Sequence, residues 1–261
     1  MRVHLFEFED LTWFPEVIRS GGTDYLRYFL NATKLYEPTI GIIKQTLEET
    51  GEPQIIDLCS GGGGYIESIH DRLASGNQNK LSIILTDKFP NVSAFQVIAQ
   101  RTNGEIKFIN EPVDALNVPG HLTGLRVMFS AIHHFQPSQV RGVLQNAVDA
   151  RSPIAIFDGG DKNIFTFLGM ILFHPIAFLL FTPFFKPFKL SRIFFTYILP
   201  LIPIYTVWDG CVSILRMYTT KELINIARET GDNSYNWKVG KIKNKFGLHA
   251  IFLVGIPERN L

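Results

Sequence analysis

The chain has 261 residues, enough to bury one substantial core, and 46% of them are apolar while only 19% are charged, which argues against disorder. Its 25 basic and 24 acidic side chains give a net charge of +1, so no basic field marks nucleic acid as the main partner. The two cysteines, Cys59 and Cys211, stand outside any metal-ligand spacing. We therefore expect no metal site and no disulfide, as in a reducing compartment. The acidic opening MRVHLFEFED is unlike a secretory signal, so a cytoplasmic location is predicted.

The first 52 residues are mixed in character and include the aromatic residues Trp13 and Tyr25. A helix is predicted from about Thr39 to Gly51, because apolar residues recur there at helical spacing and glycine suits a left-handed helix end. We expect this region to form a helical cap over the active site.

From residue 53 on, short apolar runs alternate with stretches of helical periodicity. Ser138 is the predicted cap of one of these helices. Strand–helix–strand repetition at this spacing predicts a parallel sheet with helices on both faces. The runs that are typical of buried strands are residues 54–58, 81–85, 105–109, 125–129 and 153–157.

The C-terminal region predicts one more helix and a hairpin. Thr219 and Glu222 form a capping box before an apolar helical face, and Gly231 is its expected stop. Two strand-like runs, 235–243 and 248–254, follow with four residues between them. A connection this short predicts an antiparallel pair.

The strongest motif is IIDLCSGGGGY, residues 55–65, in which a strand ends and four glycines precede a helix. Glycine permits a turn with positive φ and lets a ligand approach bare backbone, although a glycine-rich turn that binds nothing is the alternative. The dinucleotide fingerprint fails because Ile66 stands where its third glycine belongs, and no G-K-[ST] follows for a P-loop.

This loop resembles motif I of class I S-adenosylmethionine (SAM)-dependent methyltransferases, D-x-G-x-G-x-G. Asp57, Gly61 and Gly63 match it, while Cys59 replaces the first glycine. The family has a Rossmann-like α/β fold with five parallel strands, a helix and an antiparallel hairpin, in the order predicted above. The resemblance implies SAM as cofactor, and the residues it assigns to SAM binding are Asp57, Cys59, Ser60, Gly61, Gly63, Asp87, Lys88, Asp114, Ala115 and Ser130.

Three later stretches carry the same resemblance. Asp87 ends the second predicted strand, where the family has an acid that grips both ribose hydroxyls. A helix cap before Pro90 is the alternative role. Asp114 and Ala115 resemble the family's contact to the adenine amino group. The sequence FSAIHHF, residues 129–135, resembles the stretch that leaves the fourth strand in small-molecule methyltransferases.

Methyl transfer requires an aligned acceptor and, for a hydroxyl or an acidic carbon, a base. Histidine titrates near neutrality, so His133 and His134 are candidate bases, unless they only orient their loop. Arg216 either binds an acidic acceptor or pairs with Asp209. Strand carboxyl ends form the active edge of such sheets, and the catalytic candidates are His133, His134, Asp158 and Asp209. The acceptor-binding candidates are Arg216, Tyr218, Trp208, Trp13 and Tyr25.

Residues 159–218 form an apolar insertion, and the first run, 164–185, contains no charged side chain. As one helix it would reach about 30 Å, the thickness of a bilayer core, but Pro175 and Pro183 interrupt it. The alternatives are two membrane spans, a substrate lid, or a hairpin in the membrane interface. An apolar or lipid-like acceptor follows from the last two.

Three cations, Lys186, Lys189 and Arg192, recur every third residue within the insertion. They are predicted to face anionic headgroups together, so that residues 164–207 contact a membrane surface reversibly. The predicted function is methyl transfer from SAM to an apolar or lipid-like small molecule, and the alternative is a non-catalytic SAM-binding scaffold at a membrane. The predicted division is a cap (1–52), a SAM-binding core (53–158), the insertion (159–218), and a last helix and hairpin (219–261).

Overall fold

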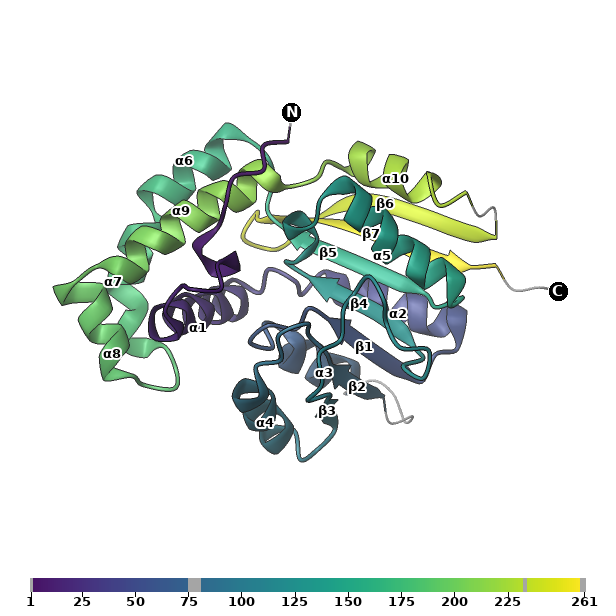
Figure 1. The fold of residues 1–261 in the computed structure, drawn as a ribbon, viewed down its shortest axis with the longest axis horizontal. Coiled ribbons are helices and arrows are strands. Elements are labelled where there is room, and N and C mark those ends of the chain that lie inside the picture. Colours follow the sequence, from purple (N-terminus) through teal and green to yellow (C-terminus); the bar gives the residue numbers. More distant parts are fainter. Residues whose placement is uncertain (1, 75–80, 232–233, 259–261) are drawn as a thin grey trace.

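A seven-stranded sheet with the order β3-β2-β1-β4-β5-β7-β6 organises the chain (Figure 1). The computed structural model describes residues 2–74, 81–231 and 234–258. The first five strands pair in parallel, and β7 and β6 add an antiparallel hairpin beside β5. The predicted α/β fold is therefore confirmed. The strands are β1 (Gln54–Leu58), β2 (Ser82–Leu85), β3 (Ile106–Phe108), β4 (Leu125–Phe129), β5 (Ile154–Gly159), β6 (Tyr235–Lys243) and β7 (His249–Pro257).

Helices cover both faces of this sheet, and each face has its own apolar cluster. Ile55 belongs to one cluster and Ile56 to the other, and both are completely buried. Because alternate side chains of a strand point to opposite faces, a strand covered on both faces is apolar throughout. One face carries α2 (Thr39–Thr50), α3 (Ile66–Ala74) and α4 (Val92–Arg101), and the other carries α5 (Pro137–Asp149) and α10 (Thr220–Arg228).

The helix ends test three of the predicted signals. Helix α2 ends at Gly51, whose φ is 74°, as predicted. The capping box of Thr219 and Glu222 is also confirmed. The Ser138 cap is wrong, because proline is pre-set for the first helical position and α5 begins at Pro137.

A helical lobe lies beyond the carboxyl ends of the parallel strands (Figure 1). In this lobe, α1 packs against α9, the last helix of the insertion. A Cβ at Gly22, on α1, would lie only 1.9 Å from Tyr205 Oη, on α9. Glycine on α1 thus permits the close approach of the two helices. The lobe comprises α1 (Glu16–Thr33), α6 (Ile164–Leu172), α7 (His174–Phe181), η3 (Thr182–Phe184), α8 (Leu190–Ile193), η4 (Phe194–Ile198) and α9 (Leu201–Arg216).

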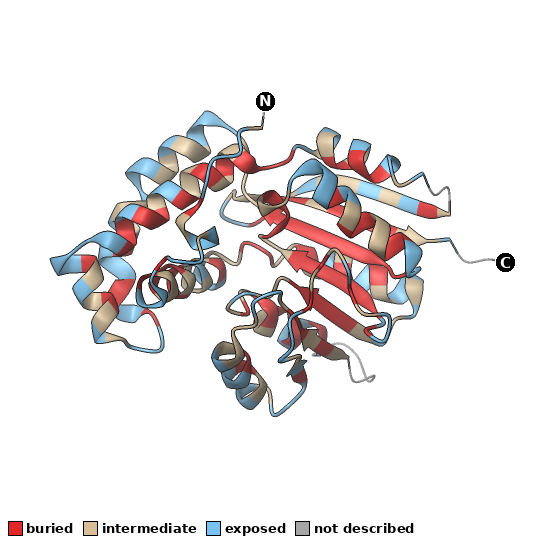
Figure 2. Ribbon diagram, in the orientation of Figure 1, coloured by how far each residue is buried: buried red, intermediate tan, exposed pale blue. Residues whose placement is uncertain are grey.

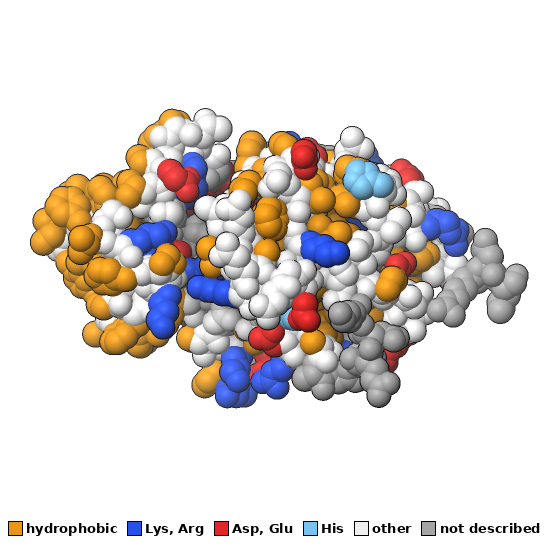
Figure 3. Space-filling model, turned by 90° about the horizontal axis from the view of Figure 1, so that it is seen from below, with side chains coloured by type: hydrophobic (Ala, Val, Ile, Leu, Met, Phe, Trp, Pro, Cys, Tyr) orange, Lys and Arg blue, Asp and Glu red, His pale blue; other side chains and the backbone are white. Residues whose placement is uncertain are grey.

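The outer surface of the lobe is apolar and exposed (Figures 2 and 3). The stretch Ile164–Phe184 is long and apolar enough to cross a membrane, and only 6% of its 18-residue apolar window is buried. The helical residues 190–198 and helix α9 are together also long and apolar enough, but the two segments meet at a bend of 80°. The most exposed large side chains of the lobe are Ile164, Phe165, Phe173, Leu180, Phe184, Phe188, Leu190, Ile198 and Ile204.

The three cations of the insertion do not form a joint headgroup-binding surface, so that prediction is wrong. Arg192 is buried, and its Nη1 donates to Asp24 Oδ2 at 2.5 Å. Lys189 Nζ donates to the same carboxylate oxygen at 2.9 Å. Asp24 lies on α1 and is itself buried. A buried carboxylate requires a partner of opposite charge, and here it recruits two of the three cations.

Candidate active site

The loop after β1 is a left-handed turn. Cys59, Gly61 and Gly63 have φ values of 57°, 54° and 83°. A Cβ at Gly63 would meet Ile98 Cδ1 at 2.1 Å, whereas nothing lies within 4 Å of a Cβ at Gly61. Gly63 is therefore needed for packing, and Gly61 leaves bare backbone facing open space that a ligand can approach. Cys59 adopts the left-handed conformation at the position where the motif has a glycine.

Asp87 ties the end of β2 to this loop. Its Oδ2 accepts a hydrogen bond from the Gly61 N–H at 2.8 Å, and its Oδ1 accepts one from the Phe89 N–H at 2.8 Å. The alternative role as a helix cap is wrong, because the Asn91 side chain caps α4. The half-buried Asp87 carboxylate thus lies beside the exposed backbone of Gly61.

Other predicted cofactor residues gather around the same strand ends. Lys88 Nζ donates to Asp114 Oδ2 at 2.7 Å, and Ala115 is buried beside this pair. Asp57 lies at the base of the loop, where burial raises the pKa of its carboxyl to about 7. The Ser60 hydroxyl donates to the Asp57 carbonyl at 2.9 Å. The structure therefore brings these five residues to one edge of the sheet.

A buried histidine–aspartate pair follows β4. His133 lies in the short helix η2 (Ile132–His134), and its Nδ1 is 2.8 Å from Asp158 Oδ1 at the end of β5. Both side chains are more than 90% buried. Among the described residues, the second carboxylate oxygen of Asp158 has no hydrogen-bond partner. Ser130 precedes η2 with a φ of 49°, and its hydroxyl hydrogen-bonds with that of Tyr36.

Residues 2–10, here called the N-terminal strap, cross this edge of the sheet. Arg2 Nη2 donates to the carbonyl of His133 at 2.7 Å. Asp209, on α9, accepts two backbone N–H groups of the strap at 2.8 and 3.0 Å. Burial raises the pKa of the Asp209 carboxyl to about 7. The strap is thus fixed both to the histidine loop and to the helical lobe.

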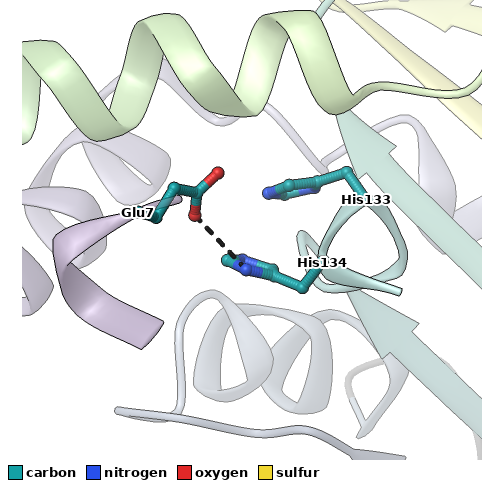
Figure 4. A group of neighbouring side chains, drawn as sticks. All are labelled: Glu7, His133 and His134. Atoms are coloured by element: carbon teal, nitrogen blue, oxygen red, sulfur yellow. Dashed lines mark ion pairs between the residues drawn. The ribbon is translucent and has the colours of Figure 1, made fainter. Parts of the chain in front are cut away.

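A charged cluster joins the strap to the second histidine (Figure 4). His134 Nδ1 lies 3.3 Å from Glu7 Oε2 and 3.1 Å from Asp10 Oδ1. Burial would lower the pKa of His134, but its hydrogen bond to Asp10 and the nearby carboxylates raise it to about 9. Arg216 Nη1 bridges Glu7 at 3.2 Å and Asp10 at 2.8 Å. Arg216 therefore pairs with the strap, and its predicted alternative pairing with Asp209 is not formed.

The aromatic candidates for acceptor binding occupy different places. Tyr218 and Trp208 border the site, and each donates to a backbone carbonyl, at 2.7 and 3.0 Å. Tyr25 lies inside the lobe, with its hydroxyl 3.2 Å from His174 Nδ1. Trp13 is exposed. Their roles in acceptor binding stay predictions.

Sequence reasoning missed the strap and its acidic side chains. Glu7 and Asp10 belong to the run FEFED, whose acids resemble any solvated N-terminus. Nothing in their spacing indicates that they meet His134, more than 120 residues later. Tyr36, which bonds Ser130, was likewise hidden among the aromatic residues of the N-terminal region.

Comparisons with known proteins support the fold. No family model and no curated protein matches the chain. The solved structures that match include the pyocyanin biosynthetic protein PhzM (14% identity, TM-score 0.50, 87% of this chain and 57% of that one). An O-methyltransferase family protein from Burkholderia thailandensis also matches, with 15% identity and a TM-score of 0.50 over 93% of this chain and 63% of that one. A third match is NcsB1, an O-methyltransferase from neocarzinostatin biosynthesis that was solved with SAM and 2-hydroxy-5-methyl naphthoic acid. It has 11% identity and a TM-score of 0.53 over 93% of this chain and 58% of that one. The chain spans about three fifths of the length of each.

Proposed function

We propose that this chain, which has the fold of class I SAM-dependent methyltransferases, transfers the methyl group of SAM to an apolar small-molecule acceptor. One observation carries the proposal. The left-handed loop after β1 leaves Gly61 facing open space beside the half-buried carboxylate of Asp87. In open α/β sheets, ligands bind at the carboxyl ends of the strands, and this is where the two residues lie.

The residues at this edge fit SAM. The bare backbone at Gly61 admits the cofactor, and Asp87 would accept the hydrogens of its ribose hydroxyls. Each oxygen of Asp87 accepts one backbone N–H, which leaves lone pairs for further donors. Asp114 and Ala115 would face the adenine. When bound, SAM supplies a methyl group already activated by its sulfonium charge.

His133 is the proposed base for a hydroxyl acceptor. If Nδ1 of His133 carries the proton and donates a hydrogen bond to Asp158, Nε2 keeps the lone pair that can accept a proton. The 2.8 Å bond to a buried carboxylate supports this arrangement, because such a partner fixes the ring and stabilises the imidazolium that forms. The strap residue Arg2 holds the backbone of the same histidine.

An apolar acceptor and contact with a membrane surface are proposed from the lobe. Soluble monomers rarely expose contiguous apolar patches of more than a few hundred Å². Here the first apolar run of the insertion is almost wholly unburied, and the lobe lies next to the strap and η2 (Figure 1). An interfacial hairpin that is inserted into one leaflet would cover this surface and bring apolar acceptors to the site.

Incubation with methyl-labelled SAM and a lipid extract tests the activity. Label should pass to an extractable apolar product, and His133→Ala should slow this transfer by about 100-fold. His70→Ala is the matched control, because it removes another buried histidine bonded to a carboxylate. SAM binding without any transfer would favour the scaffold alternative, and equal rates in wild type and His133→Ala would remove His133 as the base.

A further inference from the structure

Three metal-ligating side chains converge between the strap and η2 (Figure 4). Glu7, His133 and His134 each offer one ligand atom, and these atoms lie within 4.8 Å of one another. Glu7 and His133 are buried, and His134 is half-buried. Two imidazoles and a carboxylate form a donor set that suits zinc and other divalent transition metals.

The far side of two of the three ligands, His133 and Glu7, is already held. His133 Nδ1 bonds Asp158 at 2.8 Å, so Nε2 is the ring nitrogen left for an ion. Metal-bound histidines almost always donate their other N–H to a carboxylate, a carbonyl or water. Glu7 Oε1 is paired with Arg216 at 3.2 Å, which leaves Oε2 facing His134. The surroundings thus orient the donor atoms toward one another.

The spacing of the Glu7 and His134 donor atoms also suits an ion. Bond lengths of about 2.0–2.2 Å in a tetrahedral zinc site place neighbouring ligand atoms about 3.3 Å apart. Glu7 Oε2 lies 3.3 Å from His134 Nδ1, and Asp10 Oδ1 lies 3.1 Å from the same nitrogen. The second oxygen of Asp10 is held by Arg216 at 2.8 Å. An ion bound at this nitrogen would take the place of the Arg216 guanidinium, whose Nη1 lies 3.3 Å from it.

We propose that Glu7, His133 and His134 bind one divalent transition-metal ion of the zinc class. This site goes beyond the proposed function and does not depend on it. The ion would occupy the His133 lone pair that the proposed reaction uses as a base. Metal-free and metal-loaded protein would then differ in whether His133 can take a proton.

Titration of chelator-treated, tag-free protein with Zn²⁺ in a calorimeter tests the site, and Co²⁺ absorbance reports the coordination. We expect one ion per chain. Glu7→Gln and His134→Ala should each weaken binding by about 100-fold or more, and Asp158→Asn by about 10- to 100-fold, because it frees the His133 ring. His70→Ala should bind as wild type does, although His70 also contacts two carboxylates, at 3.2 Å each.

The wild-type titration decides the proposal even if a variant fails to fold. The absence of saturable Zn²⁺ binding to wild type would overturn it. So would Zn²⁺ binding that folded Glu7→Gln retains, or that His70→Ala loses equally. SAM binding measured on the same samples separates this result from failure of the proposed function, because Gly61 and Asp87, on which the proposed function rests, lie on the loops after β1 and β2.

Discussion

The sheet and the helical lobe contain the same kinds of apolar residue in opposite environments. Phe157, on β5, is 0% exposed between two helical layers, whereas Phe165, on α6, is 81% exposed. The sheet provides its own apolar surroundings, because helices cover both of its faces. The lobe packs only its inner side, around Phe178 and Phe185. An apolar run in a sequence therefore indicates a need for an apolar environment, which need not come from the same chain.

Polar groups differ between the two regions as well. The sheet has its main polar groups at the carboxyl edge, where Asp87 and Asp158 bond loop atoms. The lobe buries an ion pair, Asp24 with Arg192, between α1 and α8. The carboxyl edge is thus arranged around open space at Gly61, while the polar groups inside the lobe hold its helices together.

Substitution of one phenylalanine in each region should give the largest difference in the free energy of unfolding. Phe157→Ala should lower the free energy of unfolding by about 3–5 kcal/mol, because it leaves a cavity in a filled core. Phe165→Ala should change it by no more than about 0.5 kcal/mol in water, since the side chain is exposed. Urea unfolding measures both. Similar losses in the two variants would contradict the contrast.

Removal of the shared carboxylate should open the lobe alone. Asp24→Asn leaves Arg192 buried without its partner charge, a change that costs about 3–5 kcal/mol. Hydrogen exchange should then accelerate in α7 and α8 while the sheet amides stay protected. Glu16→Gln, at an exposed ion pair on the same helix, is the control and should change little. Unaltered exchange in the lobe of Asp24→Asn would contradict the account.

The pH dependence of stability tests the burial of the Asp57 carboxyl in the sheet. The pKa of the Asp57 carboxyl is about 7 in the folded chain, raised by burial from 3.8. The folded state therefore binds more protons than the unfolded state between these values, and stability should fall as pH rises from about 4 to 7. The contribution of Asp57 is up to about 4 kcal/mol. Unfolding of wild type and Asp57→Asn at both pH values measures it, and a pH slope shared by the two proteins would refute this assignment.

Liposome flotation tests whether lipid covers the lobe. Replacement of Phe165, Phe173 and Phe184 by serine should weaken partition into vesicles by about 100-fold or more, because each buried phenylalanine contributes about 1.5–3 kcal/mol. Phe246→Ser, at another exposed phenylalanine, in the turn between β6 and β7, is the control. Salt should have little effect, since Lys189 and Arg192 pair internally. A protein that never floats would leave the lobe as a lid.

The sequence predicted the sheet well because strands buried on both faces are apolar runs. The predicted bounds of β1 and β4 agree with the structure, and those of β5 differ by two residues at most. The glycine loop and Asp87 were also predicted together, since a ligand-binding turn requires a particular residue type at each position. These features are local, and local structure can be recognised from the periodicity and the composition of the sequence.

The strap and the interior of the lobe could not be predicted in the same way. Asp24 meets Arg192 across 168 residues, and Asp10 meets His134 across 124. Such pairs depend on how distant segments pack, and the sequence around a single charged residue does not indicate which residue it will pair with. The same limit explains why the three cations of the insertion were assigned to a membrane surface.

Calorimetric titration with SAM tests the central claim, that the carboxyl edge of the sheet binds this cofactor through the glycine loop and Asp87. Wild type should bind one SAM with a micromolar dissociation constant. Asp87→Ala should weaken binding by about 1–3 kcal/mol, because it removes charge-assisted hydrogen bonds, while Asp71→Ala, at an exposed acid, should bind as wild type does. The absence of SAM binding to wild type, or equal affinities of wild type and Asp87→Ala, would contradict the account.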